Sequence, residues 1–119
     1  MAVLSVQPVS LSGLEANYAN AAGGGDQFVN DGNTFFHVKN GDASDKTVTF
    51  NAQPTSVQTQ QYGDLPVSDR AVTVTAGEER FVGPFPAALF NNASGRVEVS
   101  YSGVTDVTVA AIKLPRLPA

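Results

Sequence analysis

Alternating side chains mark residues 34–40, which read TFFHVKN in one-letter code. Phe36 and Val38 fall on one face of an extended chain, whereas His37 and Lys39 fall on the other, because successive side chains of a strand point to opposite faces. This period of two predicts a strand that is buried on one face. His37 is then expected on the solvent face, beside Lys39.

The same alternation recurs along the chain outward from this segment. Runs of β-branched and aromatic residues are separated by Gly, Asn and Asp, which favour turns. The signals Asp31-Gly32, Gly77 and Ser102-Gly103 each predict a hairpin between the strands that flank them. Residues 86–92 are helical in pattern, but prolines limit the helix to about one turn, expected as a crossover between sheets. The further predicted strands span residues 28–30, 46–52, 70–76, 78–85, 96–102 and 104–114.

Seven or eight short strands predict an all-β fold, a single antiparallel β-sandwich that is Greek-key or jelly-roll-like. The sandwich is expected over residues 26–114 and a C-terminal tail over residues 115–119. Residues 1–25 are expected as an extended N-terminal arm with one short strand at residues 2–9. The sequence leaves open whether this arm is a frayed terminus or orders against a neighbouring subunit. Residues 53–69 form the longest irregular stretch, and such a loop is usually functional or disordered.

The inventory of reactive side chains is small. The chain has no cysteine and its one histidine is His37, which excludes disulfides, thiolate metal sites and thiol nucleophiles and leaves little acid–base chemistry. Glu78 and Glu79 are adjacent in a strand and cannot converge on one substrate. Asp42 and Asp45 lie in a turn, where Asx capping explains them. We therefore expect no enzymatic activity and no cofactor or metal.

Charge and hydropathy disfavour nucleic acids and membranes as partners. The formal net charge of -4 disfavours binding to a phosphate backbone, so no nucleic acid is expected as a partner. No apolar run approaches the ~18 residues of a membrane span, and the first residues lack the basic start of a signal peptide. The sequence thus predicts a protein without membrane contact, made in the cytoplasm without a cleaved leader.

Contacts with other proteins are expected from segments that the core does not need. The amides and the tyrosine of the loop at residues 53–69 suit a wet contact with a protein or a sugar. Leu114 and Leu117 stand beside prolines that end a strand, and would dock on a neighbour or back onto the sandwich. The expected interface residues are Leu4, Val6, Leu11, Leu14 and Tyr18 in the arm, Gln58, Gln60, Gln61 and Tyr62 in the loop, and Leu114 and Leu117 at the C-terminus.

Four runs resemble small virion proteins of tailed bacteriophages, among them capsid decoration, or cement, proteins built as single β-sandwiches. The runs are TFFHVKNG (34–41), KTVTF (46–50), VTAGEERFVGPFP (74–86) and VEVSYS (97–102), and the resemblance covers residues 28–113. It implies a non-enzymatic structural subunit on the exterior of a phage head. Such a subunit would grip the major capsid protein, contact neighbouring copies of itself and stabilise the capsid.

Two other functions stay open. A carbohydrate- or receptor-binding β-sandwich module of a phage tail or fibre would use Tyr62 and the amides of the loop at residues 53–69. The absence of tryptophan disfavours this alternative, because sugar sites usually stack a ring on an exposed aromatic face. A tail or neck ring subunit would share the composition and the fold, and would differ only in its place in the particle.

Overall fold

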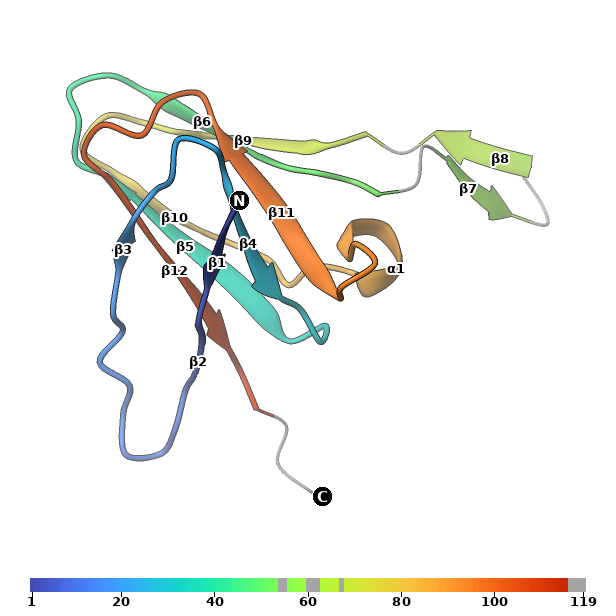
Figure 1. Ribbon diagram of the computed structural model, residues 1–119, viewed down its shortest axis with the longest axis horizontal. Coiled ribbons are helices and arrows are strands. Elements are labelled where there is room, and N and C mark those ends of the chain that lie inside the picture. Colours follow the sequence, from blue (N-terminus) through green and yellow to red (C-terminus); the bar gives the residue numbers. More distant parts are fainter. Residues whose placement is uncertain (54–55, 60–62, 67, 116–119) are drawn as a thin grey trace.

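Short strands joined by turns make up the protein in a computed structural model (Figure 1). The structure describes residues 1–53, 56–59, 63–66 and 68–115, and only the backbone of residues 56–59 and 63–66. The fold is all-β, as the sequence predicts. Its elements are β1 (Ala2–Leu4), β2 (Val6–Pro8), β3 (Ala19–Asn20), β4 (Asp26–Val29), β5 (Thr34–Asn40), β6 (Lys46–Phe50), β7 (Ser56–Thr59), β8 (Gly63–Pro66), β9 (Arg70–Val74), β10 (Glu79–Val82), α1 (Ala87–Phe90), β11 (Arg96–Tyr101) and β12 (Val107–Lys113).

Two five-stranded sheets, which we name sheet A and sheet B, contain most of these strands. Sheet A has the order β1-β4-β11-β6-β9, and sheet B has the order β10-β5-β12-β2, with β3 also paired to β12. The strands predicted from the alternation are β4, β5, β6, β9, β10, β11 and β12. The short helix α1 connects β10 of sheet B to β11 of sheet A, so the predicted crossover is confirmed.

The hydrophobic core lies between the inward faces of the two sheets. Phe28 of β4 stacks on Phe36 of β5 with ring centroids 5.5 Å apart, and Phe36 meets Phe50 of β6 edge to face at 5.4 Å. All three side chains are fully buried. Burial of a phenylalanine side chain contributes about 1.5–3 kcal/mol to the free energy of folding. This aromatic cluster therefore stabilises the contact between sheet A and sheet B. The valines of the core are Val38, Val48, Val74, Val97, Val99, Val107 and Val109.

Two strand pairs are parallel, and both involve the N-terminal segment, which we define as residues 1–20. β1 runs parallel to β4 in sheet A, and β2 runs parallel to β12 in sheet B. The prediction of antiparallel pairing is therefore wrong for these two pairs, and the sheets are mixed. The physical cause is that the chain passes from one sheet to the other at Ser5, so that one extended segment lines an edge of each sheet. Part of the expected arm is thus paired with both sheets.

The three predicted hairpins are wrong. Asp31-Gly32 connects β4 of sheet A to β5 of sheet B, and Gly77 connects β9 of sheet A to β10 of sheet B. Ser102-Gly103 likewise lies between β11 of sheet A and β12 of sheet B. Tight turns do form, since Gly32 and Gly77 have φ angles of 94° and 76°. Each turn reverses the chain across the core, because a period of two shows which face of a strand is buried and not which sheet the strand joins.

The segment at residues 53–69 contains a hairpin, so its prediction as an irregular stretch is wrong. β7 and β8 pair antiparallel from Ser56↔Pro66 to Thr59↔Gly63 and form a separate two-stranded sheet. Figure 1 shows this hairpin reaching beyond the ends of β6 and β9. The sequence signal was weak because both strands are only four residues long, β7 (SVQT) has one apolar residue, and β8 (GDLP) includes a glycine and a proline.

A buried polar contact fixes the chain where it enters β4. Asp26 is 1% exposed, and its Oδ2 accepts a hydrogen bond from the Tyr101 hydroxyl at 2.6 Å. Burial, followed by the contact with Asp26, raises the pKa of the Tyr101 phenol well above its usual range. The preceding Gly25 has a φ of 91°, and a Cβ there would lie 2.7 Å from the Val99 carbonyl oxygen. Glycine is therefore required at this close approach of two strands.

Candidate functional site

An exposed apolar cluster lies where the N-terminal segment meets the end of the last strand. The cluster, which we name the terminal patch, consists of Val9, Ser10, Leu11, Leu114 and Pro115 and borders a cavity of about 450 Å³. Leu11 is 101% exposed and Leu114 is 55% exposed. Large apolar side chains that gather on a surface, rather than being scattered singly, mark a site of interaction with another molecule.

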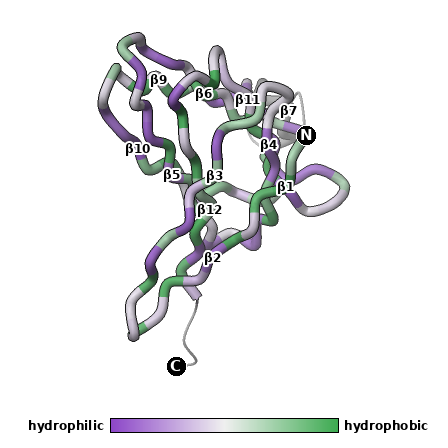
Figure 2. The backbone as a smooth tube through the Cα atoms, turned by 60° about the vertical axis from the view of Figure 1, so that its left-hand side comes forward, coloured by the Kyte–Doolittle hydropathy of each residue, from purple (hydrophilic) through white to green (hydrophobic). Residues whose placement is uncertain are grey.

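Strand pairing and a turn build the terminal patch. β2 follows β12 in register, with Val6 opposite Ala111 and Pro8 opposite Lys113. The Val9 amide then donates to the Lys113 carbonyl at 3.0 Å, which keeps the two segments together at the point where both strands end. Figure 2 shows the loop between β2 and β3 projecting from the body of the molecule. Residues far apart in the sequence therefore share one surface.

The turn between Ser10 and Gly13 carries Leu11 outward. The Gly13 amide donates to the Ser10 carbonyl at 3.0 Å, and Gly13 has a φ of 89°. The turn holds Leu11 at its exposed side, where no contact with the core shields the side chain. The full apolar surface of the Leu11 side chain is thus exposed at the terminal patch.

The predicted interface residues divide into several groups. Leu11 and Leu114 come together in the terminal patch. Leu4 and Val6 pack against the core of their own chain, and Leu14 is half-buried. Gln58 lies in β7, where only the backbone is described. Gln60, Gln61, Tyr62 and Leu117 lie outside the described residues.

Tyr18 and His37 form a contact between the N-terminal segment and the outer face of sheet B. The Tyr18 hydroxyl and His37 Nδ1 lie 2.6 Å apart, at hydrogen-bond distance. On the other side, the Phe81 ring stacks on the imidazole with centroids 3.8 Å apart and an interplanar angle of 13°. Lys39 Nζ lies 3.9 Å from the centroid of the Tyr18 ring, a cation–π contact. This cluster attaches the N-terminal segment to the sheet.

The placement of His37 on a solvent-exposed face is wrong, because the side chain is 3% exposed. Tyr18 and Phe81 cover it from two different elements, and neither is adjacent to it in the sequence. His37 Nε2 lies 3.3 Å from Glu79 Oε1, but without the geometry of a hydrogen bond. Burial lowers the pKa of His37, and the nearby Glu79 carboxylate opposes part of that shift. Phe35 of β5 and Phe81 of β10, which lie 5.8 Å apart between ring centroids, are a sequence signal that could have indicated a covered outer face.

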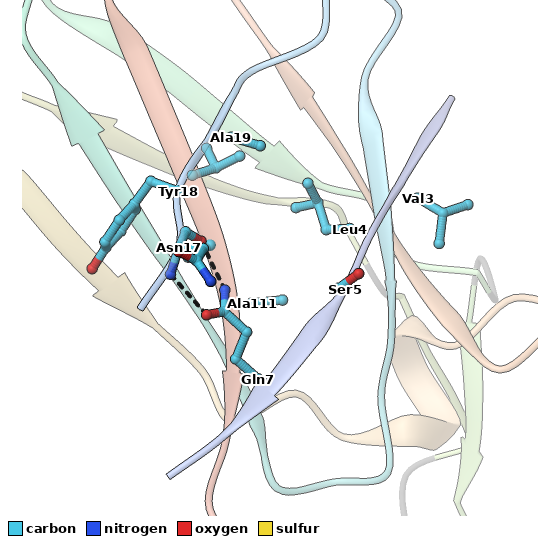
Figure 3. Close-up of a pocket in the computed structure, with 10 residues that line it drawn as sticks. Val3, Leu4, Ser5, Gln7, Asn17, Tyr18, Ala19 and Ala111 are labelled. Carbon is cyan, nitrogen blue, oxygen red and sulfur yellow. Dashed lines mark hydrogen bonds between the residues drawn. The ribbon is translucent and has the colours of Figure 1, made fainter. Parts of the chain in front are cut away.

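A second cavity is lined by both stretches of the N-terminal segment and by β12 (Figure 3). It has a volume of about 360 Å³ and an apolar floor that includes Val109 and Ala111. At its rim, Gln7 and Asn17 form a reciprocal pair, in which Gln7 Nε2 donates to the Asn17 carbonyl and the Asn17 amide donates to Gln7 Oε1, both at 2.8 Å. The pair ties the two ends of the β2–β3 loop together below the cavity. These lining groups offer shape and hydrogen bonds but no acid–base or nucleophilic pair.

The carboxylates of the acidic turn after β5, Asp42 and Asp45, accept hydrogen bonds from other groups of the protein. Asp42 Oδ2 accepts from Lys46 Nζ at 2.7 Å, and Asp42 Oδ1 accepts from the Ala43 amide at 2.8 Å. These donors lower the pKa of Asp42. Asp45 Oδ1 accepts from the Ala76 amide at 2.9 Å, which links this turn to the end of β9. Within the described ranges, no three histidine or carboxylate side chains gather closely enough to hold a metal ion.

Comparisons with protein families, curated proteins and solved structures give no match for this chain. In the part of the chain that the structure describes, no helix is both long and apolar enough to cross a membrane. The terminal patch therefore rests on geometry and chemistry alone as the candidate functional site.

Proposed function

We propose that the protein is a non-enzymatic structural protein of a tailed-phage virion, a head decoration protein that binds the major capsid protein through its terminal patch. The observation that carries this proposal is that Leu11 and Leu114, which come from opposite ends of the described chain, are exposed and line the same cavity. A leucine exposed as fully as Leu11 contributes nothing to the core of a single copy. Burying such a side chain against a partner contributes about 1.5–3 kcal/mol.

The same proposal includes the finer architecture, a β-sandwich of jelly-roll type. Its support is that the buried faces of sheet A and sheet B meet in one core and that most connections cross from one sheet to the other. Crossing connections of this kind are typical of Greek-key and jelly-roll sandwiches. A rigid two-layer body would hold the terminal patch in a fixed orientation relative to the surface it binds.

Repetition would turn a small patch into firm attachment. One patch of five residues cannot bind tightly by itself, because association costs translational and rotational freedom. On an icosahedral head, each copy would also touch neighbouring copies, and linked contacts raise the overall affinity without enlarging any one of them. Binding to the assembled shell alone would stabilise the shell by mass action.

The test is a double substitution in the patch, Leu11→Asp with Leu114→Asp, assayed on phage heads that lack the protein. Because both side chains are exposed, we expect an unchanged unfolding transition and loss of co-sedimentation with the heads. Val29→Asp is the matched control, since Val29 is 50% exposed on β4 and lies outside the patch. Wild-type occupancy of the heads by the double variant would contradict the proposal.

A further inference from the structure

A slot lies between the free edges of the two sheets, on the side where β9 and β10 run. β9 ends sheet A and β10 ends sheet B, and the two strands diverge from the turn at Gly77 that connects them (Figure 1). The space between them has a volume of about 450 Å³. It shares no residue with the terminal patch.

The floor of the slot is apolar and continuous with the core. Phe85 is 3% exposed and packs on Phe50 at 4.8 Å and on Phe90 at 5.6 Å between ring centroids. Val72 of β9 and Val82 of β10 are half-buried and pack against the same core. An apolar side chain entering the slot would thus be buried on an extension of the existing core rather than on a wet surface.

Both walls of the slot are strands with one unpaired edge. Among the described strands, β9 pairs with β6 and β10 pairs with β5, and neither has a second neighbour. Natural edge strands are usually protected by charged residues or proline. β10 begins with Glu79 and Arg80, and β9 begins with Arg70, but residues 71–74 of β9 read AVTV. The Val74 carbonyl accepts from Asn40 Nδ2 at 3.0 Å, so the open part of this edge is at residues 71–73. The β9 edge therefore offers backbone donors and acceptors to an extended polypeptide.

The charge of the lining favours an acidic occupant. The chain has a formal net charge of -4, yet the charged side chains that line the slot are Arg70 and Arg80. Arg80 donates to Glu78 at 2.9 Å in an exposed pair, which is worth little and can be shared with an incoming carboxylate. The planar guanidinium groups suit carboxylates, which they bind through two parallel hydrogen bonds.

We propose that this slot binds an extended segment of a partner protein in which an apolar side chain is flanked by acidic residues. The segment adds as a strand to the edge of β9. Its apolar side chain lies over Val82 and Phe85, and its carboxylates meet Arg70 and Arg80. The strand would close the gap between sheet A and sheet B.

Three synthetic peptides test the chemistry on the full chain: TDVFVDT, its basic counterpart TKVFVKT, and TDPFPDT, in which prolines block strand pairing. The charged residues stand two positions from the phenylalanine, so that they share its face of the added strand. We expect the first to bind with a Kd below about 1 mM and the other two at least about tenfold more weakly. Amide chemical shifts and hydrogen exchange should change along residues 70–74 and 79–82. If TDVFVDT does not bind, or binds no better than TKVFVKT or TDPFPDT, the proposal is wrong.

Charge reversal locates the site. With Arg70→Glu and Arg80→Glu combined, we expect the preference to invert, so that TKVFVKT binds at least about tenfold better than TDVFVDT. Lys39→Glu, which reverses one charge on the outer face of sheet B, should keep the wild-type preference. An unchanged preference in the double variant would overturn the proposal. Self-association that disappears in the double variant would assign the slot to a second copy, and would also overturn the proposed occupant.

Discussion

The seven-strand framework (β4, β5, β6, β9, β10, β11 and β12) and the N-terminal segment use their apolar side chains differently. In the framework, Phe28, Phe36 and Phe50 are fully buried between the sheets. In the N-terminal segment, Leu4 is only half-buried and Leu11 is 101% exposed. The framework therefore buries these apolar side chains within one copy, whereas the N-terminal segment leaves much of its apolar surface exposed.

Backbone pairing follows the same division. β5 and β12 pair over seven residues, whereas β1 and β2 pair over three each and β3 over two. Local stability depends on buried apolar contacts and on protected hydrogen bonds. The N-terminal segment should therefore open at a lower free energy than the framework, which suits a segment that carries a binding surface.

The largest effect is expected for Phe36→Ala in the framework. Phe36 contacts both Phe28 and Phe50, so its removal leaves a cavity at the centre of the core. Such truncations cost about 3–5 kcal/mol of unfolding free energy. Urea denaturation of the variant and the wild type measures the difference. A loss below about 1 kcal/mol, the size of an average substitution, would contradict the central position of this ring.

The inward faces of the framework could be predicted because they depend on local alternation. Phe36 and Val38 on β5, and Val97 and Val99 on β11, are buried on the faces that the sequence indicates. Sheet membership could not be predicted in the same way. The turn signal Asp31-Gly32 is the same whether the chain returns in its own sheet or crosses the core, and only the packing of all strands decides between the two.

Two residues of the candidate site, Leu11 and Leu114, could be singled out from the sequence, but not the surface that they share. Leu11 lies in a segment without strand or helix periodicity, and Leu114 stands beside a proline that ends a strand. Their meeting depends on the register of β2 on β12, a pairing between the two ends of the chain that no local pattern encodes. The burial of His37 depends likewise on Tyr18 and Phe81, which reach it from other elements.

A smaller effect is expected within the N-terminal segment, where Leu4→Ala and Leu11→Ala form a matched pair. Leu4 packs against the core, so its truncation should cost about 1–2 kcal/mol. Leu11 touches no core residue, so the same truncation should change the unfolding free energy by less than about 0.5 kcal/mol. Urea denaturation of both variants measures the difference. If both substitutions lowered the unfolding free energy equally, Leu4 and Leu11 would not differ in their contact with the core.

The smallest effect is expected from pH, at the contact between the two regions. Burial lowers the pKa of His37 in the folded protein below its ordinary value of 6.5. The unfolded chain therefore binds more protons than the folded chain just below pH 6.5, and the free energy of unfolding should fall as the pH drops through this range. The charged and titratable groups that face His37 are Tyr18, Lys39 and Glu79, while Ala110 opposite it on β12 has no charge.

Protonation should loosen the N-terminal segment before the framework, because burial disfavours the charged imidazole and Tyr18, which contacts it at Nδ1, belongs to the N-terminal segment. Hydrogen exchange at Ala19, which pairs with Val109, should therefore speed up on acidification more than exchange within β5. His37→Asn retains an acceptor and removes the titration, so its exchange should not change with pH beyond the intrinsic chemistry. Since His37 is the only histidine of the chain, a wild-type protein that behaved like this variant would show that the contact does not couple protonation to the N-terminal segment.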